Sequence, residues 1–325
     1  MSSGSVGASE AAIESRPQKP PALRAGSVFG VIAPASPAER DRIEAGVKQL
    51  QQLNFRVAPV LESHPEDYFA SSTDDRKHAM LDALQRKDVQ ALVATRGGYG
   101  SNYLLDDLHL PSSVTPKVLL GYSDLTSLQI FLWQKHGWVT LYGPMLAAGL
   151  DVGPDVPKGF DKSSLLAALT NADSGWSIDL QGEVLVGGVA EGRILGGCLT
   201  LVETTLGTPW QLDTRDAILL LEDRGMKPWQ VDRALMHLKQ AGLLSSLRGI
   251  ILGDFPECPA PFAGSPSVRD IAGRILRGLG VPVVYGAPVG HTTRPVLTIP
   301  LGIQARLSTK GKPTLEILEP AVSPL

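Results

Sequence analysis

Residues 118–126 read Val-Leu-Leu-Gly-Tyr-Ser-Asp-Leu-Thr, in which an apolar run ends at Ser123 and an amphipathic helix begins at once. The pattern predicts a buried strand over residues 117–121 and a helix over residues 124–135. Strands that alternate with helices build parallel sheets, and such sheets bind ligands at the carboxyl edge of their strands. The stretch therefore predicts an α/β fold with Ser123 at a ligand-binding edge.

Ser123 has two interpretations at this position. As an N-cap it would start the helix, because serine is among the best capping residues and Asp124 suits the positive end of the helix dipole. As a nucleophile it would lie beside the free N–H groups of the helix, which could stabilise an anionic intermediate. The segment alone favours the cap, so the choice depends on the rest of the chain.

The chain divides into two α/β halves. Alternating apolar and helical segments predict a doubly wound parallel sheet in the first half, and the second half is mixed α/β with more β structure toward its end. The boundaries we predict are a disordered tail at 1–25, an N-terminal domain at 26–148, a linker at 149–180 and a C-terminal domain at 181–325. The linker is rich in Gly, Pro, Asp and Ser and carries one short helix at 162–169.

Composition limits the class of partner. The 325 residues have a formal net charge of −3, which provides no basic surface for nucleic acid or an anionic membrane, so a small molecule or peptide is expected. The two cysteines, Cys198 and Cys258, lack metal-ligand spacing, which favours a reducing, cytoplasmic compartment without zinc and leaves a single disulfide open. The first two dozen residues lack the apolar core of a signal peptide, and no apolar stretch approaches the roughly 20 residues of a membrane span.

A glycine-rich turn, Arg-Gly-Gly-Tyr-Gly at residues 96–100, follows a predicted buried strand. Glycine lets the backbone approach a ligand closely, so the turn could direct N–H groups at an oxyanion, or it could be a plain strand-to-helix turn. It lacks the Gly-Lys-Ser/Thr of a phosphate loop and the dinucleotide fingerprint Gly-x-Gly-x-x-Gly. A nucleotide site is therefore not expected.

Two further residues could complete a catalytic set with Ser123. Glu222 ends the predicted strand 217–221, and His291 lies in a loop between strands with little helical or core role to explain it. A serine nucleophile needs a base, and the base needs an acid that orients it and stabilises its charged form. The order Ser, Glu, His is that of α/β-hydrolases, but Leu125 replaces the second glycine of their Gly-x-Ser-x-Gly elbow. The chain is therefore expected to reach this chemistry on another fold.

These residues belong to a set of motifs that runs from about residue 27 to residue 318 and resembles the serine LD-carboxypeptidases, a family that also includes microcin C self-immunity hydrolases. The motifs are Val-Ile-Ala-Pro-Ala-Ser-Pro (31–37), Arg-Gly-Gly-Tyr-Gly (96–100), Gly-Tyr-Ser-Asp-Leu-Thr-Ser-Leu (121–128), Gly-Arg-Ile-Leu-Gly-Gly-Cys-Leu (192–199), Leu-Gly-Thr-Pro-Trp (206–210), Leu-Glu-Asp (221–223) and Gly-His-Thr (290–292). Each motif alone is weak, but seven in the same order are specific.

The resemblance implies a role for each residue. Ser123 would be the nucleophile, His291 the general base and then acid, and Glu222 the acid that orients the histidine. Backbone N–H groups of Asp124 and Gly98 would form the oxyanion hole. The family fold is an N-terminal flavodoxin-like parallel sheet with helices on both faces and a C-terminal domain of mixed sheet. The triad would be assembled across the interface between these two domains. The resemblance also implies a homodimer.

A carboxypeptidase must also bind the free carboxylate of its substrate, and a guanidinium suits a carboxylate best. Arg96 adjoins the glycine turn and Arg294 follows His291 by three residues. Both are candidates for this contact, and the alternative is that they brace the interface between the halves.

The resemblance implies hydrolysis of the amide bond between an L-configured residue, meso-diaminopimelate or lysine, and the terminal D-alanine of murein tetrapeptides in peptidoglycan recycling. No metal or cofactor is needed. Residues 192–210 look more like the murein enzymes than the immunity hydrolases, which favours the murein substrate. Two alternatives stay open: a hydrolase of microcin C-type peptidyl-nucleotides, and a non-catalytic two-domain protein that closes on a small ligand.

Overall fold

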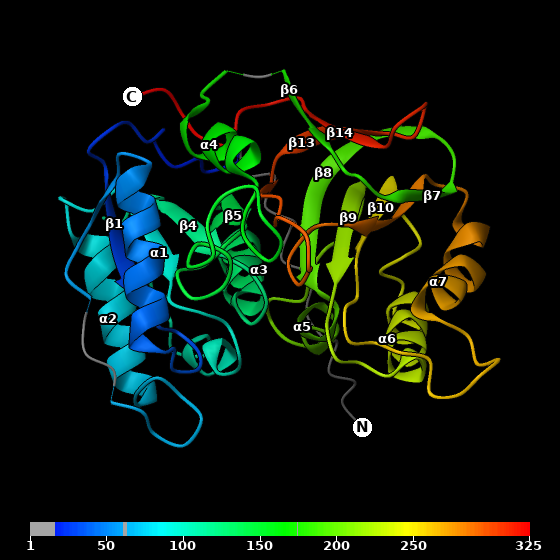
Figure 1. The fold of residues 1–325 in the computed structure, drawn as a ribbon, viewed down its shortest axis with the longest axis horizontal. Helices are drawn as coiled ribbons and strands as arrows, with labels where there is room; N and C mark the ends of the chain where they lie inside the picture. Colours follow the sequence, from blue (N-terminus) through cyan, green and yellow to red (C-terminus); the bar gives the residue numbers. More distant parts are fainter. Residues whose placement is uncertain (1–16, 61–63, 174) are drawn as a thin grey trace, which may run out of the picture.

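The computed structural model describes residues 17–60, 64–173 and 175–325, which form two sheets with their helices (Figure 1). The α-helices are α1 (Arg40–Gln52), α2 (Thr73–Gln85), α3 (Leu125–His136), α4 (Lys162–Thr170), α5 (Leu199–Thr204), α6 (Pro228–Gln240) and α7 (Val268–Leu276), and the 3-10 helices are η1 (Ser101–Leu104) and η2 (Arg277–Leu279). The strands are β1 (Val28–Ile32), β2 (Arg56–Val57), β3 (Ala91–Ala94), β4 (Val118–Gly121), β5 (Thr140–Tyr142), β6 (Trp176–Asp179), β7 (Glu183–Val186), β8 (Val189–Cys198), β9 (Ala217–Glu222), β10 (Gly249–Gly253), β11 (Val283–Ala287), β12 (Ile299–Leu301), β13 (Gln304–Ser308) and β14 (Thr314–Ile317).

The first sheet has the order β12-β5-β4-β3-β1-β2. Its strands β1 to β5 are parallel in the flavodoxin-like order 2-1-3-4-5, while β12 joins the edge antiparallel to β5. Every residue of β3 and β4 is buried, as expected of parallel strands that helices cover on both faces. The α/β class predicted for this half is confirmed.

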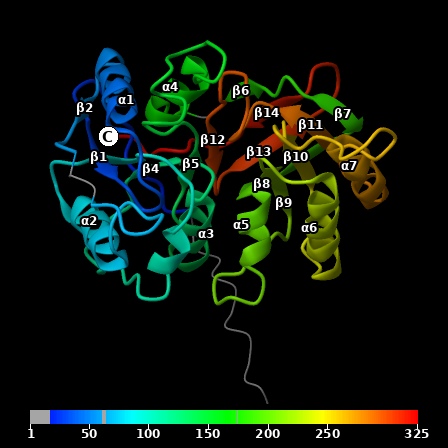
Figure 2. The same cartoon turned by 60° about the horizontal axis from the view of Figure 1, so that its bottom comes forward.

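The second sheet has eight strands in the order β6-β14-β13-β8-β9-β10-β11-β7. Its centre, β8 to β11, is parallel, and the strands outside that centre pair antiparallel. The mixed α/β class with additional β structure, predicted for the second half, is therefore also confirmed. Helices α5, α6 and α7 lie together along one side of this sheet (Figure 2).

The two sheets share one hydrophobic core. Apolar side chains of the first sheet, such as Phe29 and Leu120, belong to the same buried cluster as Ile218 and Ile251 of the second. A second cluster joins the other face of β9 and β10 to α5, α6 and α7, and a third joins α2 and α3 to the first sheet. The halves are therefore packed as one body rather than joined by a flexible connection.

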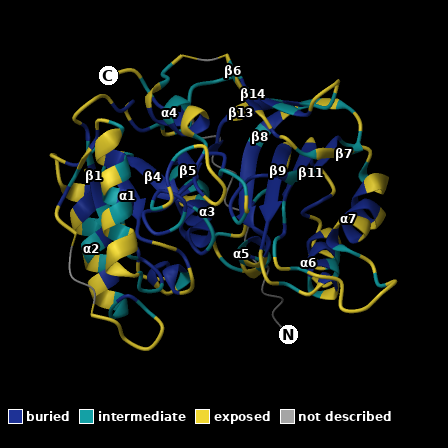
Figure 3. Cartoon of the chain, in the orientation of Figure 1, coloured by how far each residue is buried: buried dark blue, intermediate teal, exposed yellow. Residues whose placement is uncertain are grey.

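Helix α3 differs from the amphipathic helix that the sequence predicts. Its residues from Leu125 to Leu132 are all buried, and the helix is dark over most of its length in Figure 3, whereas α1 and α2 show an exposed face. The reason is its position, because α3 packs against the first sheet on one side and against α5 and β8 of the second half on the other. A helix enclosed on both sides has no solvent face to keep polar.

The predicted tail and linker are more structured than expected. Residues 1–16 of the tail lie outside the described residues, but Ala22 and Leu23 are buried, and the Ala22 N–H donates to the carbonyl of Ser323 at 2.8 Å. In the linker, α4 packs into the shared core, and β6 is the edge strand of the second sheet. No sequence pattern predicted β6, β7, β12 or α7.

Candidate active site

Ser123 and His291 line one cavity of about 290 Å³ between the two halves. Ser123 follows β4 at the carboxyl edge of the first sheet, and His291 lies in the loop after β11 of the second. Glu222 is the last residue of β9 and is fully buried behind His291, whose imidazole it binds. The fold therefore brings together the three residue types predicted for the triad, from two different sheets.

The backbone of Ser123 has a φ of 65°, in the left-handed region that serine rarely occupies. The N-cap position of α3 belongs to Asp124, so the interpretation of Ser123 as the helix cap is wrong. Held one residue before the cap, Ser123 is at a sharp turn between strand and helix that presents its side chain to the cavity. Such strain is typical of functional positions.

Glu222 and His291 form a tightly bound pair. Oε2 of Glu222 accepts hydrogen bonds from Nδ1 of His291 at 2.8 Å and from its backbone N–H at 2.9 Å. Gly290 makes this approach possible, because a Cβ there would lie 2.4 Å from Cδ of Glu222, and its φ is 60°. With Nδ1 donating to the carboxylate, Nε2 is left to accept a proton.

The environment of His291 raises the pKa of its imidazole above the ordinary value of 6.5. Burial acts to lower this pKa, but the negative charge of Glu222 and the hydrogen bond to it outweigh the effect of burial. The ring of Tyr122 packs edge-on to the imidazole, with ring centroids 5.2 Å apart. The histidine is thus oriented by a carboxylate on one side and by an aromatic ring on another.

Tyr142, the last residue of β5, is a part of the site that the sequence analysis missed. Its hydroxyl donates to Oε1 of Glu222 at 2.5 Å and accepts from the backbone N–H of Ser123 at 3.3 Å. A signal was present in the sequence, because Tyr142 ends the apolar strand next to the one that leads to Ser123. Neighbouring parallel strands end at the same sheet edge.

The glycine turn lies over Ser123. A Cβ at Gly97 would be 3.0 Å from Ser123 Oγ and 3.2 Å from the backbone N of Asp124, so only glycine fits there without a shift. Gly98 also lines the cavity, with a φ of 109° and its Cα facing Ser36. The carboxylate of Asp124 is buried and accepts from the Ser101 N–H at 2.8 Å, which fixes the start of α3 against the turn.

The residues that follow Glu222 have other partners. Asp223 accepts from the backbone N–H and the hydroxyl of Thr200 at 2.9 and 2.7 Å. Arg224 donates to both carboxylate oxygens of Glu257 at 2.7 and 2.8 Å. Of Glu222, Asp223 and Arg224, only Glu222 is paired with the histidine.

Basic side chains dominate the charge of the cavity wall, which contains Arg42, Arg96, Lys158 and Arg224. Arg42 is paired with Asp151 at 2.6 Å, as Arg224 is with Glu257. In the described part of the chain, neither Arg96 nor Lys158 forms an ion pair, and Arg96 has only a long contact of 3.4 Å to the carbonyl of Pro37. Lys158, which the sequence analysis did not consider, is held near His291 by its backbone N–H, which donates to the carbonyl of Thr293 at 2.9 Å.

Arg294 does not have the position expected of a substrate ligand. Its guanidinium pairs with Asp254 at 2.5 Å and also donates to the carbonyls of Gln181 and Gly286, and it is not among the residues of the cavity wall. The hydroxyl of Thr292 donates to the same Asp254. Arg294 thus braces the loop that carries His291 within the second half, and not the interface between the halves.

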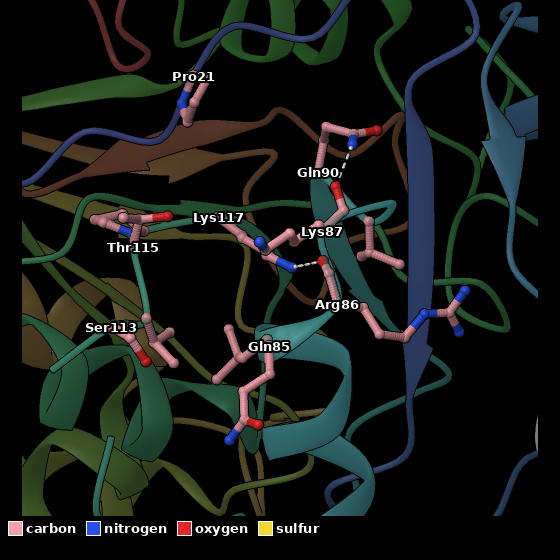
Figure 4. Close-up of a pocket in the computed structure, with 12 residues that line it drawn as sticks. Pro21, Gln85, Arg86, Lys87, Gln90, Ser113, Thr115 and Lys117 are labelled. Carbon is pink, nitrogen blue, oxygen red and sulfur yellow. Dashed lines mark hydrogen bonds between the residues drawn. The ribbon is translucent and has the colours of Figure 1, made fainter. Parts of the chain in front are cut away.

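Larger cavities, of about 790 and about 500 Å³, lie away from these residues. Figure 4 shows the second, which adjoins the start of β4 and therefore the opposite edge of the first sheet. There Lys117 donates to the carbonyls of Ala83 and Arg86 at the end of α2, at 3.0 and 2.5 Å. Its amine is occupied in closing a helix, so the smaller cavity with the Glu222–His291 pair is the candidate active site.

Comparison with known proteins agrees with the geometry. The LD-carboxypeptidase N-terminal domain matches residues 29–143, and the LD-carboxypeptidase C-terminal domain matches residues 191–307. The chain belongs to the LD-carboxypeptidase family. This LD-carboxypeptidase homologue is 33% identical over 309 residues to a probable murein peptide carboxypeptidase of Bacillus subtilis, with 94% of this chain and 95% of the relative covered.

Two further relatives span almost the whole LD-carboxypeptidase chain. The microcin C7 self-immunity protein MccF of Escherichia coli is 27% identical, with 92% of this chain and 96% of the relative covered. The crystal structure of a muramoyltetrapeptide carboxypeptidase from Oxalobacter formigenes superposes with a TM-score of 0.79 at 28% identity, and the match covers 92% of this chain and all of the other. Family membership makes the chain a hydrolase of the carboxypeptidase type.

The described residues of this LD-carboxypeptidase contain no helix with the length and apolar character needed to cross a bilayer. Within the same residues, no three His, Cys, Asp or Glu side chains gather as ligands for a metal ion.

Proposed function

We propose that the protein is a serine LD-carboxypeptidase that removes the terminal D-alanine from murein tetrapeptides in peptidoglycan recycling. The observation that carries the proposal is the Glu222–His291 pair, whose histidine lines the same cavity as Ser123. The relatives named for murein peptides and for muramoyltetrapeptide support the choice of substrate.

The first half of the reaction forms an acyl-enzyme. Nε2 of His291 takes the hydroxyl proton of Ser123 while Oγ bonds to the carbonyl carbon of the L-configured residue. The charge that develops on the carbonyl oxygen is bound by N–H groups of Asp124 and the glycine turn at Gly98. The C–N bond then breaks, and His291 returns the proton to the amino group of D-alanine as it leaves.

The second half of the reaction regenerates the enzyme. A water molecule gives a proton to His291 and its oxygen attacks the ester carbonyl, after which the bond to Ser123 Oγ breaks and the serine regains its proton. Throughout both stages of the reaction, Glu222 accepts the hydrogen bond from Nδ1–H of His291 and stabilises the imidazolium.

Among the described residues, two basic side chains of the cavity wall form no ion pair, and these supply binding for the substrate. Arg96 and Lys158 are the cations in the wall that are available for the free carboxylate of the peptide. Arg96 and Lys158 are therefore the residues proposed to bind the substrate carboxylate.

Mass spectrometry of muropeptides incubated with wild type and with Ser123→Ala tests the proposal. Wild type is expected to remove one alanine residue from the tetrapeptide, and Ser123→Ala is expected to leave it intact. An intact tetrapeptide after incubation with wild type would overturn the substrate. The MccF relative favours including a second substrate, a microcin C-type peptidyl-nucleotide. Hydrolysis of this compound in place of the tetrapeptide would assign the protein to the immunity type.

A further inference from the structure

Tyr142 joins two members of the proposed triad that come from different sheets. Its hydroxyl accepts from the N–H of Ser123, which follows β4 of the first sheet, and donates to Oε1 of Glu222, which ends β9 of the second. The side chain is fully buried, so water cannot replace either contact.

The carboxylate of Glu222 depends on this hydroxyl. With none of its surface exposed, the carboxylate must satisfy its oxygens from the protein. Oε2 accepts both donors of His291, and Oε1 accepts the hydroxyl of Tyr142 at 2.5 Å, a length typical of hydrogen bonds to a charged oxygen. Each oxygen thus has its own donor, and the carboxylate cannot rotate without losing one of them.

The direction of the hydrogen bond follows from the surroundings of Tyr142. Burial and the neighbouring charge of Glu222 raise the pKa of the tyrosine well above 10, so the hydroxyl keeps its proton and donates it. The other charged or titratable groups near this pair are His291, Tyr122, Cys198, Asp223 and Arg224.

We propose that Tyr142 is a positioning residue of the triad: it holds Glu222 from the side opposite His291 and ties the acid to the backbone of the serine across the two sheets. The inference rests on the proposed function, because it assumes that Ser123 is the nucleophile. Tyr142 is then a fourth member of the site, and it acts through Glu222 and through the left-handed backbone of Ser123.

Tyr142→Phe removes the hydroxyl and keeps the ring. Without this donor, the charge of Glu222 acts more strongly on His291, so the imidazolium is further stabilised and its pKa rises. The base form of His291 then appears at higher pH. We expect the reactivity of Ser123 to fall by about tenfold or more at neutral pH. The acidic limb of its pH–rate profile should move to higher pH.

A fluorophosphonate that labels activated serines measures this effect without depending on the identity of the natural substrate. Labelling rates from pH 5 to pH 9 are compared for wild type, Ser123→Ala, Tyr142→Phe and Tyr285→Phe, each below its unfolding temperature. Tyr285 is a matched control, because it is a partly buried tyrosine on β11 that stacks on Phe255 away from the triad. Tyr285→Phe should match wild type in rate and in pH profile.

A slower Tyr142→Phe with a shifted acidic limb supports the proposal. A Tyr142→Phe variant with the wild-type pH profile overturns it, whether or not the variant is less stable. Nuclear magnetic resonance of the His291 Nδ1 proton provides a second reading, because a resonance unchanged between wild type and Tyr142→Phe would also overturn the proposal. Labelling of wild type without cleavage of tetrapeptide would remove only the proposed substrate, whereas wild type no more reactive than Ser123→Ala would remove the triad and this inference with it.

Discussion

Glu222 receives two hydrogen bonds on a single oxygen from His291, one from the side chain at 2.8 Å and one from the backbone at 2.9 Å. The backbone hydrogen bond fixes the position of the His291 main chain, and the side-chain hydrogen bond fixes which ring nitrogen faces the cavity. Together they orient the imidazole more strictly than a ring contact alone would.

Glu222→Gln should therefore reduce kcat by on the order of 10³- to 10⁴-fold, because the amide no longer holds the Nδ1–H tautomer or stabilises the imidazolium. Steady-state hydrolysis of tetrapeptide measures the loss. Glu191→Gln, which changes an exposed glutamate paired with Arg306, is the control and should keep wild-type activity. Full activity in Glu222→Gln would show that Glu222 is not the acid of the triad.

The raised pKa of His291 predicts a pH dependence of activity. The histidine must be neutral to act as a base, so kcat/KM should fall on the acidic side with a midpoint above 6.5. A pH–rate profile of kcat/KM measures this midpoint. A midpoint below 6.5 would contradict the balance in which Glu222 outweighs burial.

The same pKa predicts a pH dependence of stability. Because the folded state binds this proton more tightly than the unfolded state, the pair stabilises the fold fully below pH 6.5, and this contribution is lost as the pH rises through the raised pKa. The difference in unfolding free energy between wild type and His291→Gln should decrease over that range. Denaturant unfolding at a series of pH values measures this difference, and a difference that grows with pH would contradict a raised pKa of His291 in the folded state.

Gly97→Ala should reduce activity more than stability. The added Cβ would meet Ser123 at 2.9 Å from Cβ and 3.0 Å from Oγ, so the serine or the turn must shift. A displacement of this size at a nucleophile costs on the order of 10²-fold in rate. Gly278→Ala is the matched control, since its Cβ would meet nothing within 4 Å. Equal activities in the two variants would rule out close contact between the turn and the nucleophile.

Lys158→Ala and Arg96→Ala should each raise KM for the tetrapeptide by roughly tenfold with little change in kcat, because they remove a charge that binds the substrate rather than one that acts in the reaction. The effect should weaken as salt is added. Lys312→Ala, at an exposed position in the turn between β13 and β14, is the control. A kcat effect without a KM effect would assign these cations to the chemical step instead.

Leu128→Ala should lower the free energy of unfolding by about 2–5 kcal/mol, because Leu128 is fully buried in the core beneath α3. Denaturant unfolding measures the change. Leu325→Ala, at a side chain that is 76% exposed, should leave the free energy of unfolding near that of wild type. A small loss for Leu128→Ala would mean that α3 is less firmly packed between the halves than its burial indicates.

The sequence predicted the parts of the site that stand at strand ends. Ser123 and Glu222 follow continuous apolar runs, so their place at a carboxyl edge could be inferred from the runs alone. The contact of Tyr142 with Glu222 could not, because it depends on how two sheets approach each other, and no local pattern encodes that approach. Arg294 illustrates the same limit, since its pairing with Asp254 is set by the folding of a loop.

The fold was predictable where hydrophobic periodicity was long. The strands predicted over residues 117–121 and 217–221 lie close to β4 and β9, and the helix predicted over residues 124–135 lies close to α3. Strand β12 has only three residues, too few to show a period, and is recognisable only through its partner β5. The range of helix α3 was predictable but its burial was not, because a helix enclosed by two packing partners does not display the exposed face expected from its sequence.

Strand β12 has a consequence for biosynthesis. The sheet that holds Ser123 is completed by residues 299–301, which pair with β5 although some 160 positions of chain separate them. During translation the edge of β5 stays open until residues 299–301 have left the ribosome, so the nucleophile-bearing half cannot finish folding ahead of the other. A gene fragment that stops after residue 148 would expose this unpaired edge to neighbouring chains, and we expect its product to aggregate.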